Sequence, residues 1–156
     1  TSQGIPFFLL GTDMMRSKKG NHNSYNAPDE INQIDWSLKS KYYNVFNYHK
    51  GLIALRKAHP AFCMYQSEEI RRNIIFHPCP DWVIAFSINN YANNDQWRAI
   101  FVVYNAGIGP ETLSLPEEGL WHVVVDENTA GNKPVASFTG KEVTVAARSA
   151  KVLYMD

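Results

Sequence analysis

The chain is organised around one polar stretch, residues 20–36, which read GNHNSYNAPDEINQIDW. A loop of this length in a compact domain is usually either functional or disordered. Its amide, carboxylate and aromatic side chains are the groups that hydrogen-bond to sugar hydroxyls and stack on sugar rings. The apolar residues Ile31, Ile34 and Trp36 favour a loop that is docked on the protein over a disordered one.

An apolar run precedes the loop. Residues 5–10 begin with Ile5 and Pro6 and continue without alternation between apolar and polar positions. This pattern predicts a strand that is buried on both faces, with Pro6 near its start, where a strand tolerates proline best. Such a strand needs parallel neighbours, and the sequence predicts no second strand–helix unit. We therefore expect the chain to begin inside a larger structure.

One amphipathic helix is expected after the loop, over residues 41–58. Ser40 is its predicted N-cap, and Pro60 ends the pattern because it disfavours helical backbone at the residue before it. Gly51 inside the helix costs up to about 1 kcal/mol relative to alanine, which close packing against a sheet would explain. The apolar stripe recurs at a spacing of three and four residues, at Tyr42, Val45, Phe46, His49, Leu52 and Ile53.

From about Glu68 the periodicity changes to two, with turn residues between short apolar runs and no helix among them. This pattern predicts an antiparallel β-sandwich. Three tryptophans, Trp82, Trp97 and Trp121, begin or lie within these runs, and either core packing or a sugar-stacking surface would explain them. The predicted strands cover residues 72–77, 82–89, 97–104, 112–115, 120–125, 142–146 and 151–155.

Composition narrows the classes of partner. In 156 residues, 15 Lys and Arg balance 15 Asp and Glu, so no electrostatic footprint for nucleic acid or an anionic membrane is expected. No apolar run approaches the roughly 20 residues of a transmembrane helix. Cys63 and Cys79 could pair or stay free, and neither has metal-ligand spacing. We predict no cofactor and no metal, and the compartment, bacterial cytoplasm or secreted, stays open.

Three segments carry a family resemblance: GIPF at residues 4–7, RSKKGNHNSYNAPDEINQIDW at 16–36 and YHKGLIALRKAHPAF at 48–62. They resemble the C-terminal part of type I pullulanases, debranching enzymes of the α-amylase family (glycoside hydrolase family 13). The segment VAARSAKVLY at residues 145–154 resembles the closing strands of the family's C-terminal β-sandwich.

The resemblance implies a mainly β chain with two parts. Residues 1–62 would be the remnant of a catalytic (β/α)8 barrel, with its last strand, the substrate loop and its last helix. Residues 63–156 would be the C-terminal antiparallel β-sandwich. A whole barrel needs about 250 residues, so most of it would lie upstream.

The family hydrolyses α-1,6-glucosidic bonds with retention, using an Asp nucleophile, a Glu acid/base and a second Asp that stabilises the transition state. In the family, all three lie before the eighth barrel strand. The carboxylates here do not match those motifs, and Thr12 and Asp13 stand where relatives often carry Gln and Glu. The resemblance therefore implies no catalytic residue in this chain and no activity of the chain alone.

The resemblance also implies substrate binding by the loop. Residues 29–33 resemble the family pattern Asp-x-x-Asn-Arg, in which the Asp bonds sugar hydroxyls, although Gln33 replaces the Arg. The alternative is that these Asn and Asp side chains bond their own backbone. Asp35 and Trp36 are expected to lock the loop in place. The substrate-binding candidates are Asp29, Asn32, Tyr25, Asn23 and Asn26.

Two functional classes follow. In the first, the chain is a fragment of a starch- or pullulan-debranching hydrolase, with an α-glucan and the upstream barrel of the same polypeptide as partners. In the second, it is a stand-alone β-sandwich accessory or carbohydrate-binding module without catalysis. The unpaired apolar strand at residues 5–10 also predicts self-association.

Overall fold

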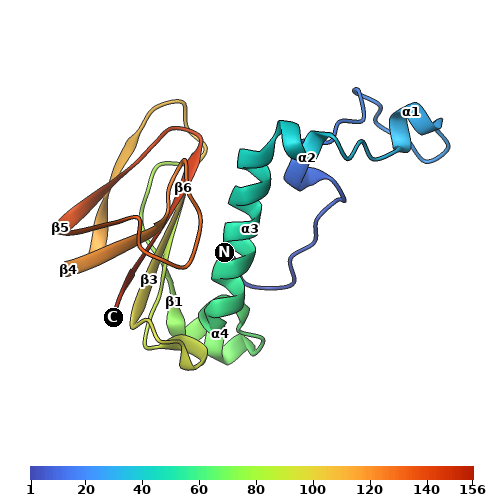
Figure 1. Ribbon diagram of the computed structural model, residues 1–156. Coiled ribbons are helices and arrows are strands. Elements are labelled where there is room, and N and C mark those ends of the chain that lie inside the picture. Colours follow the sequence, from blue (N-terminus) through green and yellow to red (C-terminus); the bar gives the residue numbers. More distant parts are fainter.

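The computed structural model describes residues 1–156 as a β domain, a long helix packed beside it and an extended N-terminal segment (Figure 1). The strands are β1 (Ile74–Phe76), β2 (Val83–Ile88), β3 (Ala99–Asn105), β4 (Glu111–Val125), β5 (Ala136–Val145) and β6 (Ser149–Met155). The helices are α1 (Asp29–Asn32), α2 (Leu38–Lys41), α3 (Tyr43–Ala58) and α4 (Ser67–Asn73), with 3-10 turns at Thr12–Met14, Pro60–Cys63 and Ala92–Asn94.

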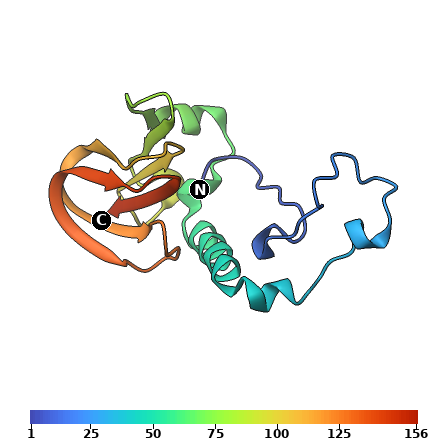
Figure 2. The same ribbon diagram turned by 90° about the horizontal axis from the view of Figure 1, so that it is seen from above.

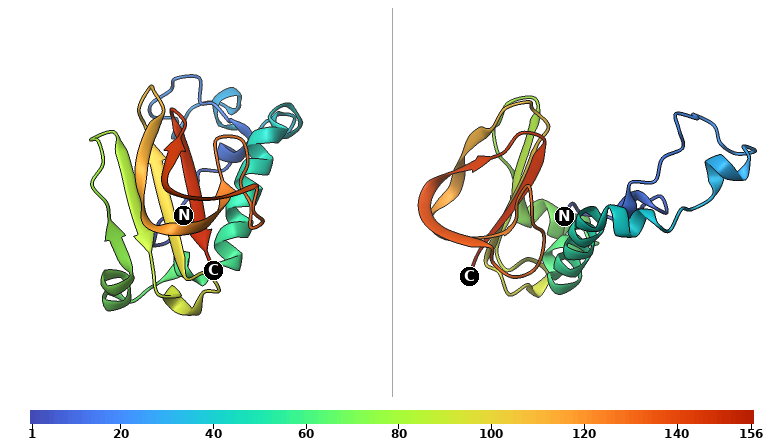
Figure 3. Two further views of the ribbon diagram at one scale, coloured as in Figure 1. Left: turned by 90° about the vertical axis from the view of Figure 1, so that its left-hand side faces the viewer. Right: turned by 45° about the horizontal axis from the view of Figure 1, so that its top comes forward.

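The six strands form one antiparallel sheet in the order β1-β2-β3-β6-β4-β5. The long strands β4 and β5 bend over, so that the sheet encloses a core between its two halves (Figure 3). This confirms the predicted mainly β, antiparallel domain. There are six strands instead of seven because residues 112–115 and 120–125 belong to one strand, β4, whose pairing with β5 shifts register between Ser114 and Gly119.

Strand β3 contributes side chains to two hydrophobic cores, one on each face of the sheet. Phe101 and Val103 point into the core between the halves of the sheet, while Ile100 and Val102 point into a second core beneath α3. Successive side chains of a strand alternate between its faces. Because both faces of β3 are covered, its sequence is apolar at nearly every position, as is typical of a central strand.

Helix α3 covers one face of the sheet with Leu55, which is fully buried, and with the partly buried Tyr48 and Leu52. The predicted N-cap is wrong: Ser40 lies inside the short helix α2, and Tyr42 precedes α3 without a capping hydrogen bond. The predicted C-terminal end of this helix at Ala58 is confirmed.

Gly51 lies where α3 touches the loop between β4 and β5. A Cβ atom placed on Gly51 would lie 1.9 Å from the carbonyl oxygen of Ala130. The close packing predicted for this glycine is therefore confirmed, although its neighbour is a loop and not a strand of the sheet.

Helix α4 was not predicted. Its seven residues carry Glu68 and Glu69 in the first turn and Arg71 and Arg72 in the last, which is favourable to the helix dipole. The strand expected over residues 72–77 is therefore shortened to β1.

Residues 5–10 do not form a strand in this structure, in which the parallel neighbours that the apolar run needs are not present. Phe7 is 96% exposed, and no neighbouring strand offers hydrogen bonds. An extended segment without a partner gains no ladder hydrogen bonds, so it stays irregular.

Residues 2–4 are nevertheless fixed to the rest of the chain by hydrogen bonds. Arg56 of α3 donates hydrogen bonds to the carbonyl oxygens of Ser2 (2.7 Å) and Gly4 (2.5 Å). Gln3 donates to the carbonyl oxygen of Ala61 and accepts from the amide of Met64. The segment then crosses to the side of α3 that faces away from the sheet, where the polar loop lies (Figure 2).

The remaining predictions concern cysteines, tryptophans and membranes. Cys63 and Cys79 are free thiols. Trp97 and Trp121 are buried in the two cores, as core packing predicts, while Trp82 is half-exposed. No helix is both long and apolar enough to cross a bilayer.

Candidate functional site

Asn32 holds the polar loop together. Its side-chain amide donates to the carbonyl oxygens of Ser24 and Ala27, both at 2.8 Å. Its side-chain oxygen accepts from Lys18, and its backbone carbonyl accepts from Arg16. Both polar atoms of the Asn32 side chain are thus engaged within the loop, so the residue fixes the loop's shape.

Asn23 and Asp35 make local hydrogen bonds as well. The side-chain oxygen of Asn23 accepts from the amide of Tyr25 at 3.4 Å. Asp35 accepts from the hydroxyl and the amide of Ser37, and these bonds lower the pKa of its carboxyl. Asp35 therefore joins the end of the loop to α2, whereas Trp36 stays 64% exposed.

Three of the predicted substrate-binding residues are free of such bonds. The side chains of Tyr25, Asn26 and Asp29 make no hydrogen bond within the chain. Tyr25 is 93% exposed, and Asp29 opens the single turn α1. The structure thus divides the five candidates into two that shape the loop and three whose polar groups are available to a ligand.

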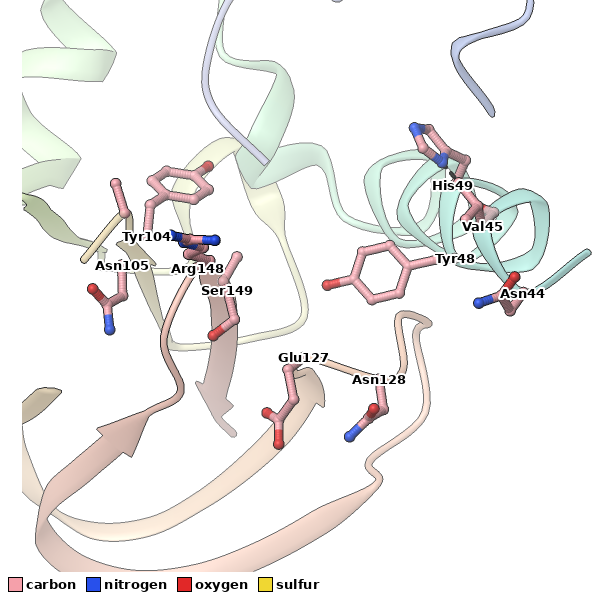
Figure 4. Close-up of a pocket in the computed structure, with 12 residues that line it drawn as sticks. Asn44, Val45, Tyr48, His49, Tyr104, Asn105, Glu127, Asn128, Arg148 and Ser149 are labelled. Atoms are coloured by element: carbon pink, nitrogen blue, oxygen red, sulfur yellow. Dashed lines mark hydrogen bonds between the residues drawn. The ribbon is translucent and has the colours of Figure 1, made fainter. Parts of the chain in front are cut away.

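A second candidate site was missed by the sequence analysis. It is an open groove of about 810 Å3 between α3 and the sheet, shown in Figure 4. We call it the α3 groove. It is lined by α3, by the ends of β3 and β6 and by the loop after β4; its most prominent side chains are Asn44, Tyr48, Tyr104, Glu127, Asn128 and Arg148.

The two tyrosines of the α3 groove are anchored. Tyr48 donates to the carbonyl oxygen of Asp126 at 2.7 Å, and Tyr104 hydrogen-bonds to the hydroxyl of Thr1 at 2.5 Å. Burial raises the pKa of Tyr48, helped by the nearby charges of Asp126 and Glu127, and burial also raises the pKa of Tyr104. Both phenols therefore stay neutral at physiological pH.

The α3 groove gave no sequence signal because its lining comes from distant segments. Tyr48, Tyr104 and Arg148 are far apart in the chain and meet only through the sheet order and the packing of α3. Local motifs and spacing cannot reveal such a site. No group of three or more His, Cys, Asp and Glu side chains is arranged to hold a metal ion.

In sequence, the chain is similar to pullulanases and isoamylases. Residues 70–129 match the family described as "Pullulanase, all-beta domain". The chain is 30% identical over 154 residues to the pullulanase of Bacillus subtilis (strain 168), covering 99% of this chain and 21% of that protein. It is 28% identical to the isoamylase of Flavobacterium sp, covering 95% of this chain and 22% of that protein.

Solved structures of pullulanases are similar to this chain as well. The pullulanase from Bacillus acidopullulyticus superposes with a TM-score of 0.93 at 42% identity, covering 99% of this chain and 19% of that one. The pullulanase from Anoxybacillus sp. LM18-11 in complex with maltotriose gives a TM-score of 0.88 at 33% identity, covering 99% and 21%. The chain spans about a fifth of the length of these relatives.

Proposed function

We propose that the chain, which resembles pullulanases over nearly its whole length, serves a debranching glycoside hydrolase. In that role it contributes a substrate loop and a β-sandwich to an enzyme that cleaves α-1,6-glucosidic bonds in pullulan and branched starch. The observation that carries the proposal is the superposition on the Bacillus acidopullulyticus pullulanase along 99% of the chain, at 42% identity.

Residues 1–62 are proposed to complete a (β/α)8 barrel. The polar loop lies between the apolar segment 5–10 and α3, which is the position of a βα loop. Active sites of such barrels are built from these loops, at the carboxyl ends of the strands. The exposed Phe7 and Leu10 support this assignment, because a strand that other strands complete would bury them.

Within the loop, Asp29, Tyr25 and Asn26 are proposed to contact an α-glucan. An ionised carboxylate accepts stronger hydrogen bonds from hydroxyls than a neutral group does, and a tyrosine ring can pack on a sugar face. Asn32 and Asn23 hold the loop in shape, on the support of their bonds to the loop backbone.

Hydrolysis with retention needs two carboxyl groups about 5 Å apart on either side of the scissile bond. We assign no residue of this chain to that pair. The chain therefore positions the substrate, and cleavage belongs to the longer enzyme.

A chimera tests the proposal. Residues 1–156 replace the matching segment of the Bacillus acidopullulyticus pullulanase, and release of reducing sugar from pullulan is measured. We expect the chimera to hydrolyse pullulan and the isolated chain to release none above a buffer blank. A chimera that folds, as judged by its circular dichroism and a cooperative melt, but does not cleave pullulan would overturn the proposal.

A further inference from the structure

The α3 groove lies on the sheet side of α3, whereas the polar loop lies on the other side (Figures 1 and 4). Its volume of about 810 Å3 falls within the range of about 300–1,000 Å3 that is typical of small-molecule sites. Nothing in the proposed function uses it.

An exposed apolar side chain of the sheet lies beside Tyr104. Tyr104 pairs with Ile84 on β2 and with Ala150 on β6, so these residues share the face that α3 covers. Ile84 is 53% exposed on this face. Tyr104 and Ala150, which line the groove, therefore adjoin an exposed apolar position on the sheet.

The rim of the groove is polar and unpaired. Asn44, Glu127, Asn128 and Arg148 make no side-chain hydrogen bond and no ion pair within the chain. Together they offer amide donors and acceptors, a carboxylate acceptor and guanidinium donors. One negative and one positive side chain cancel, so the rim does not attract an anion or a cation preferentially.

We propose that the α3 groove is a non-catalytic binding site for a short neutral α-glucan. Glucose rings present apolar C–H faces and hydroxyl edges, which match the anchored aromatic rings and the mixed donors and acceptors of the rim. A covering protein segment fits less well, because it would bury four polar side chains that have no partner in the chain.

The test is calorimetric titration of residues 1–156 with maltotriose, together with hydrogen exchange. We expect saturable binding, and slower exchange with ligand in residues 44–49 and 126–130. The double variant Glu127→Gln, Arg148→Ala should weaken binding by roughly tenfold or more, as expected for lost hydrogen bonds to charged groups. The matched double variant Glu142→Gln, Arg71→Ala changes the same types of exposed side chain elsewhere and should leave the affinity unchanged.

Three results would overturn the proposal. The first is a titration without saturable heat in the wild-type chain. The second is ligand protection confined to residues 16–36, with affinity lost in Asp29→Ala and kept in Glu127→Gln, Arg148→Ala. The third is protection of the groove in the isolated chain that disappears in the pullulanase chimera, because polypeptide and not glucan would then occupy the groove. The pullulan activity of the chimera is a separate readout, so failure here leaves the proposed function standing.

Discussion

The imidazole of His59 lies flat on the indole of Trp97, with ring centroids 3.3 Å apart and an interplanar angle of 18°. Tyr154 also stacks on Trp97, and the centroids of these two rings lie 3.9 Å apart. His59 directly follows α3, while Tyr154 belongs to β6. The stack therefore joins the end of the helix to the sheet.

Asp95 holds the stack from one side. Its carboxylate accepts from His59 Nδ1 at 2.9 Å and from the amides of Trp97 and Ala61. Its side chain is fully buried. We predict that Asp95→Ala lowers the free energy of unfolding in urea by about 3–5 kcal/mol, the usual cost of removing one partner of a buried polar pair.

The matched control for Asp95→Ala is Glu117→Gln, which breaks the partly exposed ion pair with Arg98. Such surface pairs contribute about 0–1 kcal/mol. Equal losses of stability in the two variants would contradict the special role of Asp95.

Asp95 is also expected to make the stability of the fold depend on pH in the acid range. Burial alone would raise the pKa of its carboxyl, but hydrogen bonds from His59, Trp97 and Ala61 outweigh burial and hold the pKa below its usual value of 3.8. The contribution of a carboxyl with a lowered pKa is complete above the unfolded-state pKa and is lost as the pH falls through the folded-state pKa. Urea titrations should therefore show a loss of stability below about pH 4 that is smaller in Asp95→Ala. An equal loss of stability at low pH in the wild type and in Asp95→Ala would show that Asp95 is not its source.

Gly51→Ala is predicted to destabilise the chain although alanine favours helices. The gain in helix propensity is at most about 1 kcal/mol. The new methyl group would meet the Ala130 carbonyl at 1.9 Å, and overpacking of this kind typically costs about 1–3 kcal/mol. Thermal melts should show a lower Tm, whereas Gly109→Ala, where a Cβ meets no atom within 4 Å, should melt like the wild type. A higher Tm for Gly51→Ala would show that the loop moves aside freely.

Sequence patterns predicted those parts of the fold whose cause is local. The short apolar runs of β2, β3 and β6 and the stripe of α3 depend on a few neighbouring residues, and these elements were found near their predicted positions. Helix α4 was missed because its short run, residues 67–73, carries charges more than an apolar stripe. Residues 5–10 form no strand in this chain because an apolar run does not specify its own hydrogen-bond partner.

The candidate site shows the same limit. The sequence identified the polar loop, but it could not tell which of its side chains bond the loop itself, as Asn32 does, and which stay free, as Tyr25 does. That distinction depends on how the loop turns. The α3 groove could not be predicted from the sequence, because Tyr48 and Arg148 come together only in the folded chain.

Asp29→Ala in the pullulanase chimera tests the substrate role of the loop. Loss of a hydrogen bond from a sugar hydroxyl to a carboxylate should lower kcat/KM on pullulan by an amount equivalent to about 1.5–3 kcal/mol. The control is Glu30→Ala, the neighbouring exposed carboxylate in α1. An unchanged kcat/KM in Asp29→Ala, or an equal loss in both variants, would leave Asp29 with no specific contact to the substrate.

The last prediction concerns residues 5–10 in the isolated chain. The amides of Phe7, Phe8, Leu9 and Leu10 donate no backbone hydrogen bond, and the four side chains are 60–96% exposed. We therefore expect rapid hydrogen exchange through this segment, against slow exchange in β3, and dimers or larger species at high concentration by sedimentation, since exposed apolar segments associate. Phe7→Ser, Phe8→Ser should reduce the association without changing the Tm of the β domain, and Ile108→Ser, an equally exposed apolar residue in another loop, should not reduce it. Strong protection of Phe7 to Leu10 in a dilute monomer would mean that the segment finds its partner within one chain. In that case, completion by further barrel strands would no longer explain its apolar sequence.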